Sequence, residues 1–340
     1  MITELSDFLN QPLSVGEKTI QKRLVLAPMT MVGNVAFREL VSNFGGYGLL
    51  FTEMCSAKRI PHENRYISPY FRWRDAERDR LVCQIFGADP KIMATAAQRI
   101  EEEGFFGIDI NFGCSVFSIC RQNCGAQILK NPDLAVRIVA GIREAVSIPL
   151  FVKYRTGWQD DSQVAVELAK GFEDAGADAL TFHPRVAPDR RNRPAKWSYI
   201  GLVKHSVSIP VFGNGDVFDS QDCWKMIQTT GCDGVAIGRL AIARPWTFAL
   251  WAGGFKATPT IYLESALKLA QLVAGHYDSA AALKRFKRFA LYFSANFRFG
   301  HTLFSRIQNL ENMTAVEDIL YHFFAESPEL VSRPNLNFFI

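Results

Sequence analysis

Short apolar runs alternate along the chain with longer stretches whose apolar residues recur at helical spacing. The runs are rich in Val, Ile, Leu and Phe, which is typical of strands buried on both faces of a parallel sheet. Eight of them occur in chain order: Leu24–Ala27, Leu49–Thr52, Leu81–Phe86, Gly107–Ile110, Leu150–Lys153, Ala179–Phe182, Val211–Gly213 and Gly234–Ile237. Eight strands alternating with helices predict an α/β fold, a (β/α)8 TIM barrel.

The segments around these runs fit the same fold. Pro90–Glu103 follows Asp89 and has proline at its first position, which favours the start of a helix, and Asp133–Val146 also has helical spacing. Ser14–Arg23 contains a Gly-Glu turn between two short stretches. We expect this segment to be a hairpin that plugs the bottom of the barrel.

The strand signals stop after Trp251. Ala252–Pro259 contains Gly and Pro and is expected to be a linker, and the pattern is helical from Thr260 onward. A barrel typically takes about 250 residues, so a chain of 340 residues has room for one barrel and a small appendage. We therefore predict a barrel domain over residues 1–252 and a small all-α C-terminal domain over residues 253–340.

Polar residues follow nearly every apolar run, at the strand ends where barrel active sites form. They are Pro28-Met29-Thr30, Glu53, Gln84, Asn111 with Cys114, Lys153 with Arg155, His183 with Arg185, Asn214-Gly215-Asp216 and Gly238-Arg239. One such residue could simply be a satisfied polar group in the core. A full set on one rim indicates a binding site.

Glycine-containing turns follow the last two runs, where barrels commonly bind phosphate. They read GNGD, ending at Asp216, and IGR, ending at Arg239. Backbone N–H groups of such turns can approach an anion closely, and the Arg239 guanidinium adds a charged fork. The GxGxxG motif of dinucleotide sites is absent, which favours a mononucleotide flavin.

Three further rim residues suit a flavin. Lys153 could stabilise the anionic reduced ring near its N1 and O2 edge, and the Gln84 amide could pair with the N3 and O4 edge. His183 could bind phosphate or flavin. The alternatives are a salt bridge at the barrel mouth for Lys153 and a structural role for His183.

Cys114 lies just beyond the fourth run, where a weakly acidic thiol could donate a proton to carbon. The alternative is a buried structural cysteine. Cys114, Cys120 and Cys124 could also suggest iron–sulphur or zinc, but their spacing matches neither Cys-x2-Cys nor the ferredoxin patterns, so we expect no metal.

Composition and charge restrict the class further. Hydrophobic residues make up 48% of the chain and charged residues 21%, which is ordinary for a globular protein. The N-terminus lacks a secretion signal, no apolar run approaches the ~18 residues of a bilayer span, and seven irregularly spaced cysteines indicate reduced thiols. We expect a cytoplasmic protein with no membrane association and no obligate protein partner.

The ordered motifs together resemble the tRNA-dihydrouridine synthase family. They are APM with AFR, TEM, QIFG.DP, IDINFGC, VKYRTGW, the His183-x-Arg185 pair, GNGD and GCDGVAIGR, and they extend from about Leu24 to Phe248. The resemblance implies a flavin barrel with a helical RNA-binding domain that reduces uridine to dihydrouridine in RNA, most often tRNA. NADPH would reduce the FMN, and Cys114 would protonate C5 of a uracil extracted from the RNA.

The resemblance also implies roles for individual residues. FMN would be held by Pro28, Met29, Thr30, Gln84, Lys153, His183, Asn214, Gly215, Asp216, Gly238 and Arg239. The substrate would be held by Asn111, Lys153, Arg155, Arg185 and Arg38, the last as an RNA contact. The chain departs from the family pattern at Ser115, where proline is usual after the cysteine, and at Pro184 and Val186 in the usual His-Gly-Arg-Thr.

Basic residues gather in two places that could meet RNA. One is the loop between Arg185 and Lys196, and the other is the C-terminal group Lys284, Arg285, Lys287, Arg288, Arg298, His301 and Arg306. The net charge of +4 permits a nucleic-acid partner without requiring one. Two alternatives stay open: a small-molecule reductase of the dihydroorotate dehydrogenase or old-yellow-enzyme type, and a non-catalytic RNA-binding barrel.

Overall fold

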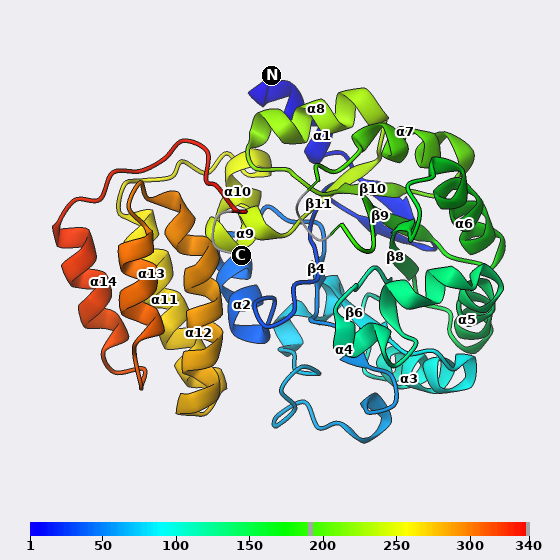
Figure 1. Cartoon of the computed structure of the whole chain (residues 1–340), viewed down its shortest axis with the longest axis horizontal. Helices are drawn as coiled ribbons and strands as arrows, with labels where there is room; N and C mark the ends of the chain where they lie inside the picture. The colour runs from blue at the N-terminus through cyan, green and yellow to red at the C-terminus, as the bar shows by residue number, and fades with distance from the viewer. Residues whose placement is uncertain (190–192, 338–340) are drawn as a thin grey trace.

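Eight parallel strands form a nearly closed ring at the centre of the computed structural model, which describes residues 1–189 and 193–337 (Figure 1). In chain order the strands are β3 (Leu24–Leu26), β4 (Leu50–Phe51), β6 (Leu81–Phe86), β7 (Gly107–Phe112), β8 (Leu150–Gly157), β9 (Ala179–Val186), β10 (Val211–Asn214) and β11 (Gly234–Ile237). From β4 to β11 each of these strands pairs with the next one along the chain, and β11 pairs with β3. The backbone N–H of Leu26 donates to Leu49 O at 3.0 Å, which links the first two strands. The expected barrel is confirmed.

Helices cover the outer face of the ring. They are α2 (Val35–Phe44), α3 (Pro90–Glu102), α5 (Pro132–Ala145), α6 (Ser162–Asp174), α7 (Trp197–Ser206), α8 (Ser220–Thr230), α9 (Arg239–Ala243) and α10 (Thr247–Ala252), with α1 (Ile2–Leu9) preceding the barrel. Between β4 and β6 the chain forms β5 (Cys55–Ser56), which pairs with β6, and two short 3₁₀ helices (Ile60–His62 and Asp75–Arg80). This segment takes the place of one barrel helix.

The inside of the barrel is filled by its own small hydrophobic cluster, which includes Phe51, Phe151 and Phe212. The predicted hairpin is confirmed: β1 (Leu13–Val15) pairs antiparallel with β2 (Lys18–Ile20), and Val15 and Ile20 belong to this inner cluster. The hairpin thus closes the end of the barrel where the strands begin, and the opposite end stays open for a site.

Four strands, β7 to β10, are longer than the apolar runs predicted. The ladder between β8 and β9 continues through Tyr154 opposite Phe182 and Arg155 opposite His183. Side chains alternate along a strand, so Tyr154 and Phe182 pack outside the ring, with ring centroids 4.7 Å apart, whereas Arg155 and His183 point inward. Charged residues at inward positions interrupt the apolar pattern, and the sequence analysis ended these strands too early.

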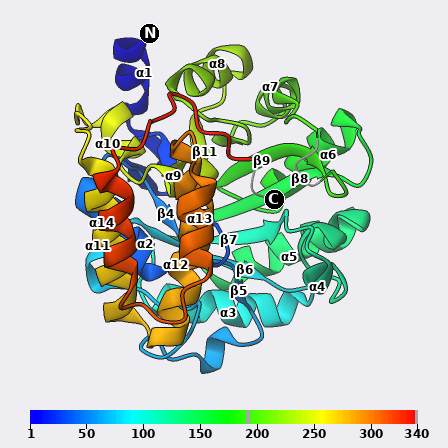
Figure 2. The same cartoon turned by 60° about the vertical axis from the view of Figure 1, so that its left-hand side comes forward.

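Four helices follow the segment between Ala252 and Ile261, where a linker was expected. They are α11 (Ile261–His276), α12 (Ser279–Phe293), α13 (His301–Gln308) and α14 (Val316–Ala325). Figure 2 shows them beside the barrel, where α11 packs on α2 and α12 packs on α9. Their buried side chains belong to the same hydrophobic cluster as the outer layer of the barrel. None of the helices described in this structure is long and apolar enough to cross a membrane.

Candidate functional site

A cavity of about 320 Å³ opens at the carboxyl ends of the strands. Its volume lies in the range typical of small-molecule and cofactor sites. All eleven residues that the sequence assigned to a flavin line it, together with Asn111, Cys114, Arg155 and Arg185. Of the residues predicted to hold cofactor or substrate, Arg38 alone lies elsewhere; Glu53, from the wider set of strand-end residues, also lies outside the cavity lining.

One end of the cavity is organised by the amide of Asn214 on β10. Its Oδ1 accepts hydrogen bonds from Lys153 Nζ at 3.3 Å and from His183 Nδ1 at 2.8 Å, and its Nδ2 donates to Ala236 O at 2.7 Å. His183 is therefore the neutral tautomer with the proton on Nδ1. Burial, reinforced by the cations of Arg155 and Lys153, holds the His183 pKa well below its usual value.

Beside Asn214, three charged side chains form a compact set. Arg185 donates to His183 Nε2 at 3.2 Å and to Asp216 Oδ2 at 2.6 Å, and Arg239 donates to Asp216 Oδ1 at 3.0 Å. Burial acts to raise the Asp216 pKa, but the hydrogen bond from Arg185 and further partners lower it below its usual value. The carboxylate is thus neutralised by two guanidinium groups, and Arg239 is held where the GNGD and IGR turns meet.

The floor of the cavity carries two of the predicted amides, and they lead to Asp109, a residue that the sequence analysis did not single out. Gln84 on β6 donates to Asp109 Oδ2 at 2.6 Å, and Asn111 on β7 donates to Gln84 Oε1 at 2.8 Å. Asp109 is fully buried, and burial raises its pKa to about 7. The Lys153 cation opposes this effect, and burial lowers the pKa of Lys153 itself to about 8.

The Cys114 thiol lines the cavity from the loop after β7. Burial raises its pKa, so the thiol keeps its proton at neutral pH. Two contacts hold the loop: Arg155 Nε donates to Gly113 O at 2.7 Å, and the Ala126 N–H donates to Cys114 O at 2.9 Å. Gly125 makes the second contact possible, because it has a φ of +62° and an added Cβ would lie 2.5 Å from Cys114 O.

The other two cysteines of the loop do not join Cys114 in a metal site. Cys120 and Cys124 are free thiols, and Cys120 Sγ lies 3.6 Å from the carbonyl oxygen of Cys114. Within residues 1–189 and 193–337, no three His, Cys, Asp or Glu side chains converge as metal ligands.

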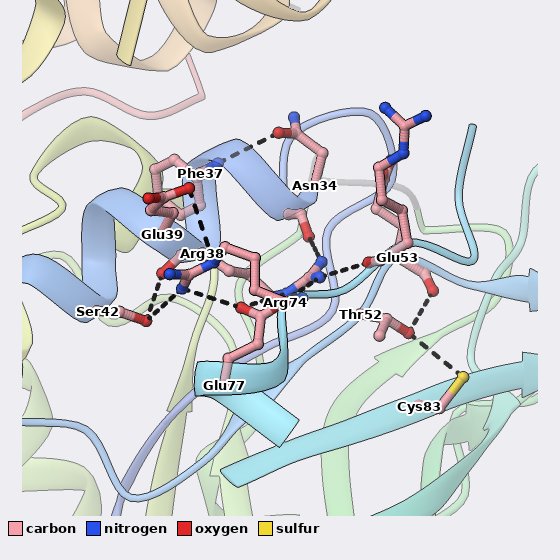
Figure 3. Close-up of polar contacts among 12 residues, drawn as sticks. Asn34, Phe37, Arg38, Glu39, Ser42, Thr52, Glu53, Arg74, Glu77 and Cys83 are labelled. Carbon is pink, nitrogen blue, oxygen red and sulfur yellow. Dashed lines mark hydrogen bonds and ion pairs between the residues drawn. The ribbon is translucent and has the colours of Figure 1, made fainter. Parts of the chain in front are cut away.

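Arg38 occupies a position that does not fit the expected RNA contact. It lies on α2 and is 0% exposed. Figure 3 shows its guanidinium enclosed by polar groups: Arg38 Nη2 donates to Glu77 Oε1 at 2.8 Å and Nη1 donates to Gly33 O at 2.8 Å. The AFR motif therefore supplies a buried ion pair behind the cavity wall, since a guanidinium with no accessible surface cannot contact a phosphate.

Glu53 of the TEM motif lies near the same cluster (Figure 3). It is buried, and its carboxylate accepts the backbone N–H of Met31, which has a left-handed φ of 68°. Burial raises the Glu53 pKa to about 7, against the opposing pull of Arg285 and Arg38. Because Met31 directly follows the cavity residues Met29 and Thr30, Glu53 stabilises the turn that forms this wall.

The helical region contributes one residue to the cavity that the sequence analysis missed. Tyr292, near the end of α12, lines the cavity beside Gly238 and Arg239. The C-terminal segment also returns to this edge, where Arg239 contacts Asn337 and Arg244 Nη2 donates to Val331 O at 2.8 Å. In the sequence, Tyr292 could not be distinguished from the aromatic core residues around it in the same helix.

The two basic groups are only partly available to a partner. In α12, Lys284 and Arg288 are exposed, but Arg285 is buried and donates to Pro69 O at 2.8 Å, and Lys287 Nζ donates to Leu310 O. In the loop after β9, Arg193 is paired with Asp189 at 3.6 Å. Arg190 and Arg191 of that loop lie outside the described residues.

Comparison with known proteins shows the family of this chain. The family model for dihydrouridine synthase matches residues 25–318. The chain belongs to the dihydrouridine synthase family. The tRNA-dihydrouridine synthase B of Pseudomonas aeruginosa is 38% identical over 234 residues, which cover 69% of this chain and 70% of that protein. The probable tRNA-dihydrouridine synthase 1 of a Synechocystis species is 35% identical over 236 residues, covering 69% and 66%.

Solved structures share the fold at much lower identity. Histamine dehydrogenase from a Rhizobium species superposes with a TM-score of 0.55 at 15% identity, covering 72% of this chain and 47% of its own. Membership of the dihydrouridine synthase family makes this chain an oxidoreductase. The solved structure shows that its barrel is shared with a distant protein. The family resemblance inferred from the motifs is confirmed.

The buried Glu53 carboxyl makes a testable prediction about stability. Its folded-state pKa of about 7 lies above the usual 4.5, so ionising it costs free energy that the unfolded chain does not spend. The contribution of the protonated Glu53 carboxyl to the free energy of unfolding is fully present below pH 4.5 and is lost as pH rises through 7. Glu53→Gln keeps an acceptor for Met31 without the charge, so the unfolding free energy of the variant should gain about 3 kcal/mol on wild type between pH 4.5 and 8.

Urea denaturation of both proteins across this pH range measures the effect. A difference between the two that is independent of pH would contradict the raised pKa. Glu63→Gln is a suitable control because this carboxylate lies near the surface in an ion pair with Arg59 at 3.2 Å.

Proposed function

We propose that this protein reduces uridine to dihydrouridine in tRNA, with FMN as its cofactor and NADPH as the electron donor. The observation that carries the proposal is that the Cys114 thiol lies in the same cavity as Lys153 and the Gly215 and Gly238 turns. Burial raises the pKa of this thiol. Membership of the family and the names of the tRNA-modifying relatives support the substrate. A small-molecule reductase would need the cavity but not the basic face of α12.

The residues of the cavity fit FMN. Its phosphate would lie at the turns around Gly215 and Gly238, where Arg239 supplies charge and small residues let the backbone approach. An added Cβ at Gly238 would lie 3.0 Å from Met29 Sδ, and Gly215 has a φ of +116°, so both turns depend on glycine. Lys153 would face the N1 and O2 edge of the ring. When bound and reduced, FMN would supply a hydride to C6 of the uracil.

The side chains of the protein account for the rest of the reaction. Cys114 delivers a proton to C5, so hydride and proton together saturate the C5–C6 double bond and leave a thiolate that regains its proton from solvent. Burial keeps the thiol protonated beforehand. Arg155 and Lys153 stand beside the thiol and would hold the uracil oxygens and stabilise negative charge that develops on the ring.

A line of side chains on α12 leads from the surface to the cavity. Lys284, Arg288 and Tyr292 are four residues apart, so they share one face of the helix. Lys284 and Arg288 are exposed, and Tyr292 lines the cavity. This face would bind the phosphates of tRNA and direct the target nucleotide toward Cys114.

The assignment of Cys114 predicts a loss of activity on substitution. Cys114→Ala should lower the rate of dihydrouridine formation by about 10²- to 10⁴-fold, because the proton must then come from water. FMN content should be unchanged. The measurement is mass-spectrometric quantification of dihydrouridine in tRNA from a strain lacking the gene, after incubation with purified enzyme and NADPH.

Cys120→Ala is the matched control, since it removes a second half-buried thiol of the same loop. Wild-type rates in Cys114→Ala would contradict the role of this thiol. An enzyme that oxidises NADPH but forms no dihydrouridine in any tRNA would contradict the substrate.

The basic face of α12 predicts a salt-dependent loss of binding. The double variant Lys284→Ala, Arg288→Ala should weaken tRNA binding and reduce the slope of log Kd against log salt by between about 1 and 2. Fluorescence anisotropy with labelled tRNA measures both. Lys170→Ala, Lys225→Ala on the outer helices α6 and α8 removes the same charge and should leave the slope unchanged; equal effects of the two pairs would contradict a specific face.

A further inference from the structure

A continuous set of hydrogen bonds joins the interior of the barrel to the backbone of Cys114. Asp109 accepts from Gln84 at 2.6 Å, and Gln84 accepts from Asn111 at 2.8 Å. Asn111 Oδ1 in turn accepts the backbone N–H groups of Gly113 at 3.1 Å and Cys114 at 2.9 Å. Residues from two adjacent strands and the following loop are thus linked, since Gln84 lies opposite Asp109 in the β6–β7 ladder.

The two ends of this set dictate the orientation of both amides. A backbone N–H can only donate, so Asn111 must present Oδ1 to Cys114 and Nδ2 to Gln84. A carboxylate oxygen accepts, so Gln84 must present Nε2 to Asp109 and Oε1 to Asn111. If either amide turned over, two donors or two acceptors would face each other, and burial makes such a mismatch costly.

We propose that Asp109 is a positioning residue for the reaction: by fixing the orientation of the Gln84 and Asn111 amides, it holds the Cys114 backbone and thereby places the thiol in the cavity. This inference rests on the proposed function, in which Cys114 delivers the proton. Asp109 does not line the cavity, so it acts through the two amides.

The burial of Asp109 carries a cost that a purely structural role would not require. The side chain is 0% exposed, and its Oδ1 makes no hydrogen bond of good geometry within the described part of the chain, although the backbone N–H of Lys153 is near enough to lower the pKa of the carboxyl. A buried carboxyl group with an unsatisfied oxygen lowers the stability of a fold. Burial raises its pKa to about 7, and a proton on the unpaired Oδ1 leaves Oδ2 free to accept from Gln84. The amide orientation therefore holds in both protonation states.

These hydrogen bonds also limit which atoms of Asn111 remain available to bind a substrate. Both acceptor positions of Oδ1 serve backbone N–H groups, and Nδ2 lies 2.8 Å from Gln84 Oε1 and 3.8 Å from Met54 Sδ. The primary role of Asn111 in this arrangement is to hold the Cys114 loop.

Two substitutions of Asp109 separate amide orientation from charge. Asp109→Leu has a similar shape but no acceptor, so Gln84 and Asn111 lose their fixed orientation. Asp109→Asn loses the charge but keeps an oxygen that can accept from Gln84. The readout is alkylation of Cys114 by iodoacetamide in the protein without tRNA or NADPH, measured by mass spectrometry relative to Cys120 in the same molecule.

We expect the Cys114 to Cys120 alkylation ratio to change at least threefold in Asp109→Leu and to stay within twofold of wild type in Asp109→Asn. The kcat for dihydrouridine formation should fall by on the order of 100-fold in Asp109→Leu, with little change in KM for tRNA, because a displaced thiol affects the chemical step. Asp109→Asn should retain most of the kcat. An unchanged ratio in Asp109→Leu, or equal losses in both variants, would overturn the proposal.

A measurement on wild-type protein covers the case in which Asp109→Leu does not fold. Backbone amide exchange at Cys114 should be as slow as in strand β7, because this N–H is bonded to Asn111. Exchange as fast as at the exposed residues of the following loop would overturn the proposal. Alkylation and exchange need no turnover, so they report on the amide set even if Cys114 proves not to be the proton donor.

Discussion

The barrel mouth depends on one constraint: polar and charged side chains that point into a buried ring must find their partners on other strands of the ring. Asn214 meets this constraint for Lys153 and His183 together, since both donate to its Oδ1. Asp216 does so for Arg185 and Arg239. Because every member shares a partner with another, the groups are held in place before any ligand arrives, which is what electrostatic catalysis requires.

The same constraint determines which groups carry charge. Burial lowers the pKa of Lys153 to about 8 and keeps His183 neutral. Lys153 is thus a cation at neutral pH that a modest change of environment can deprotonate. Cys114, whose pKa burial raises, stays a thiol beside it. A cation and a protonated thiol thus line the same cavity.

The sequence predicted the barrel because buried parallel strands leave a repeated apolar signal. It predicted most of the rim because polar residues directly after such strands lie where barrels form their sites. It did not reveal where strands β8 and β9 end, since Arg155 and His183 are inward-facing polar residues within the strands. Asp109 was missed for the same reason. Its position was the available signal: Asp109 lies two residues before Asn111, so both side chains point into the barrel.

Other errors arose where charge on a sequence was equated with charge on a surface. Arg38 and Arg285 are buried, and only the packing of α2 and α12 against the barrel decides this. That packing also brings Tyr292 into the cavity wall, so the helical region is part of the site as well as an appendage. No local pattern could show this contact, because it joins residues that are far apart along the chain.

The most direct test of the account is to titrate the flavin-free protein with FMN and with riboflavin while following flavin fluorescence. The account predicts one FMN per chain, bound at least tenfold more tightly than riboflavin, because the turns at Gly215 and Gly238 and the Arg239 guanidinium would clamp the phosphate that riboflavin lacks. Equal affinities for the two flavins, or no binding of either, would contradict it.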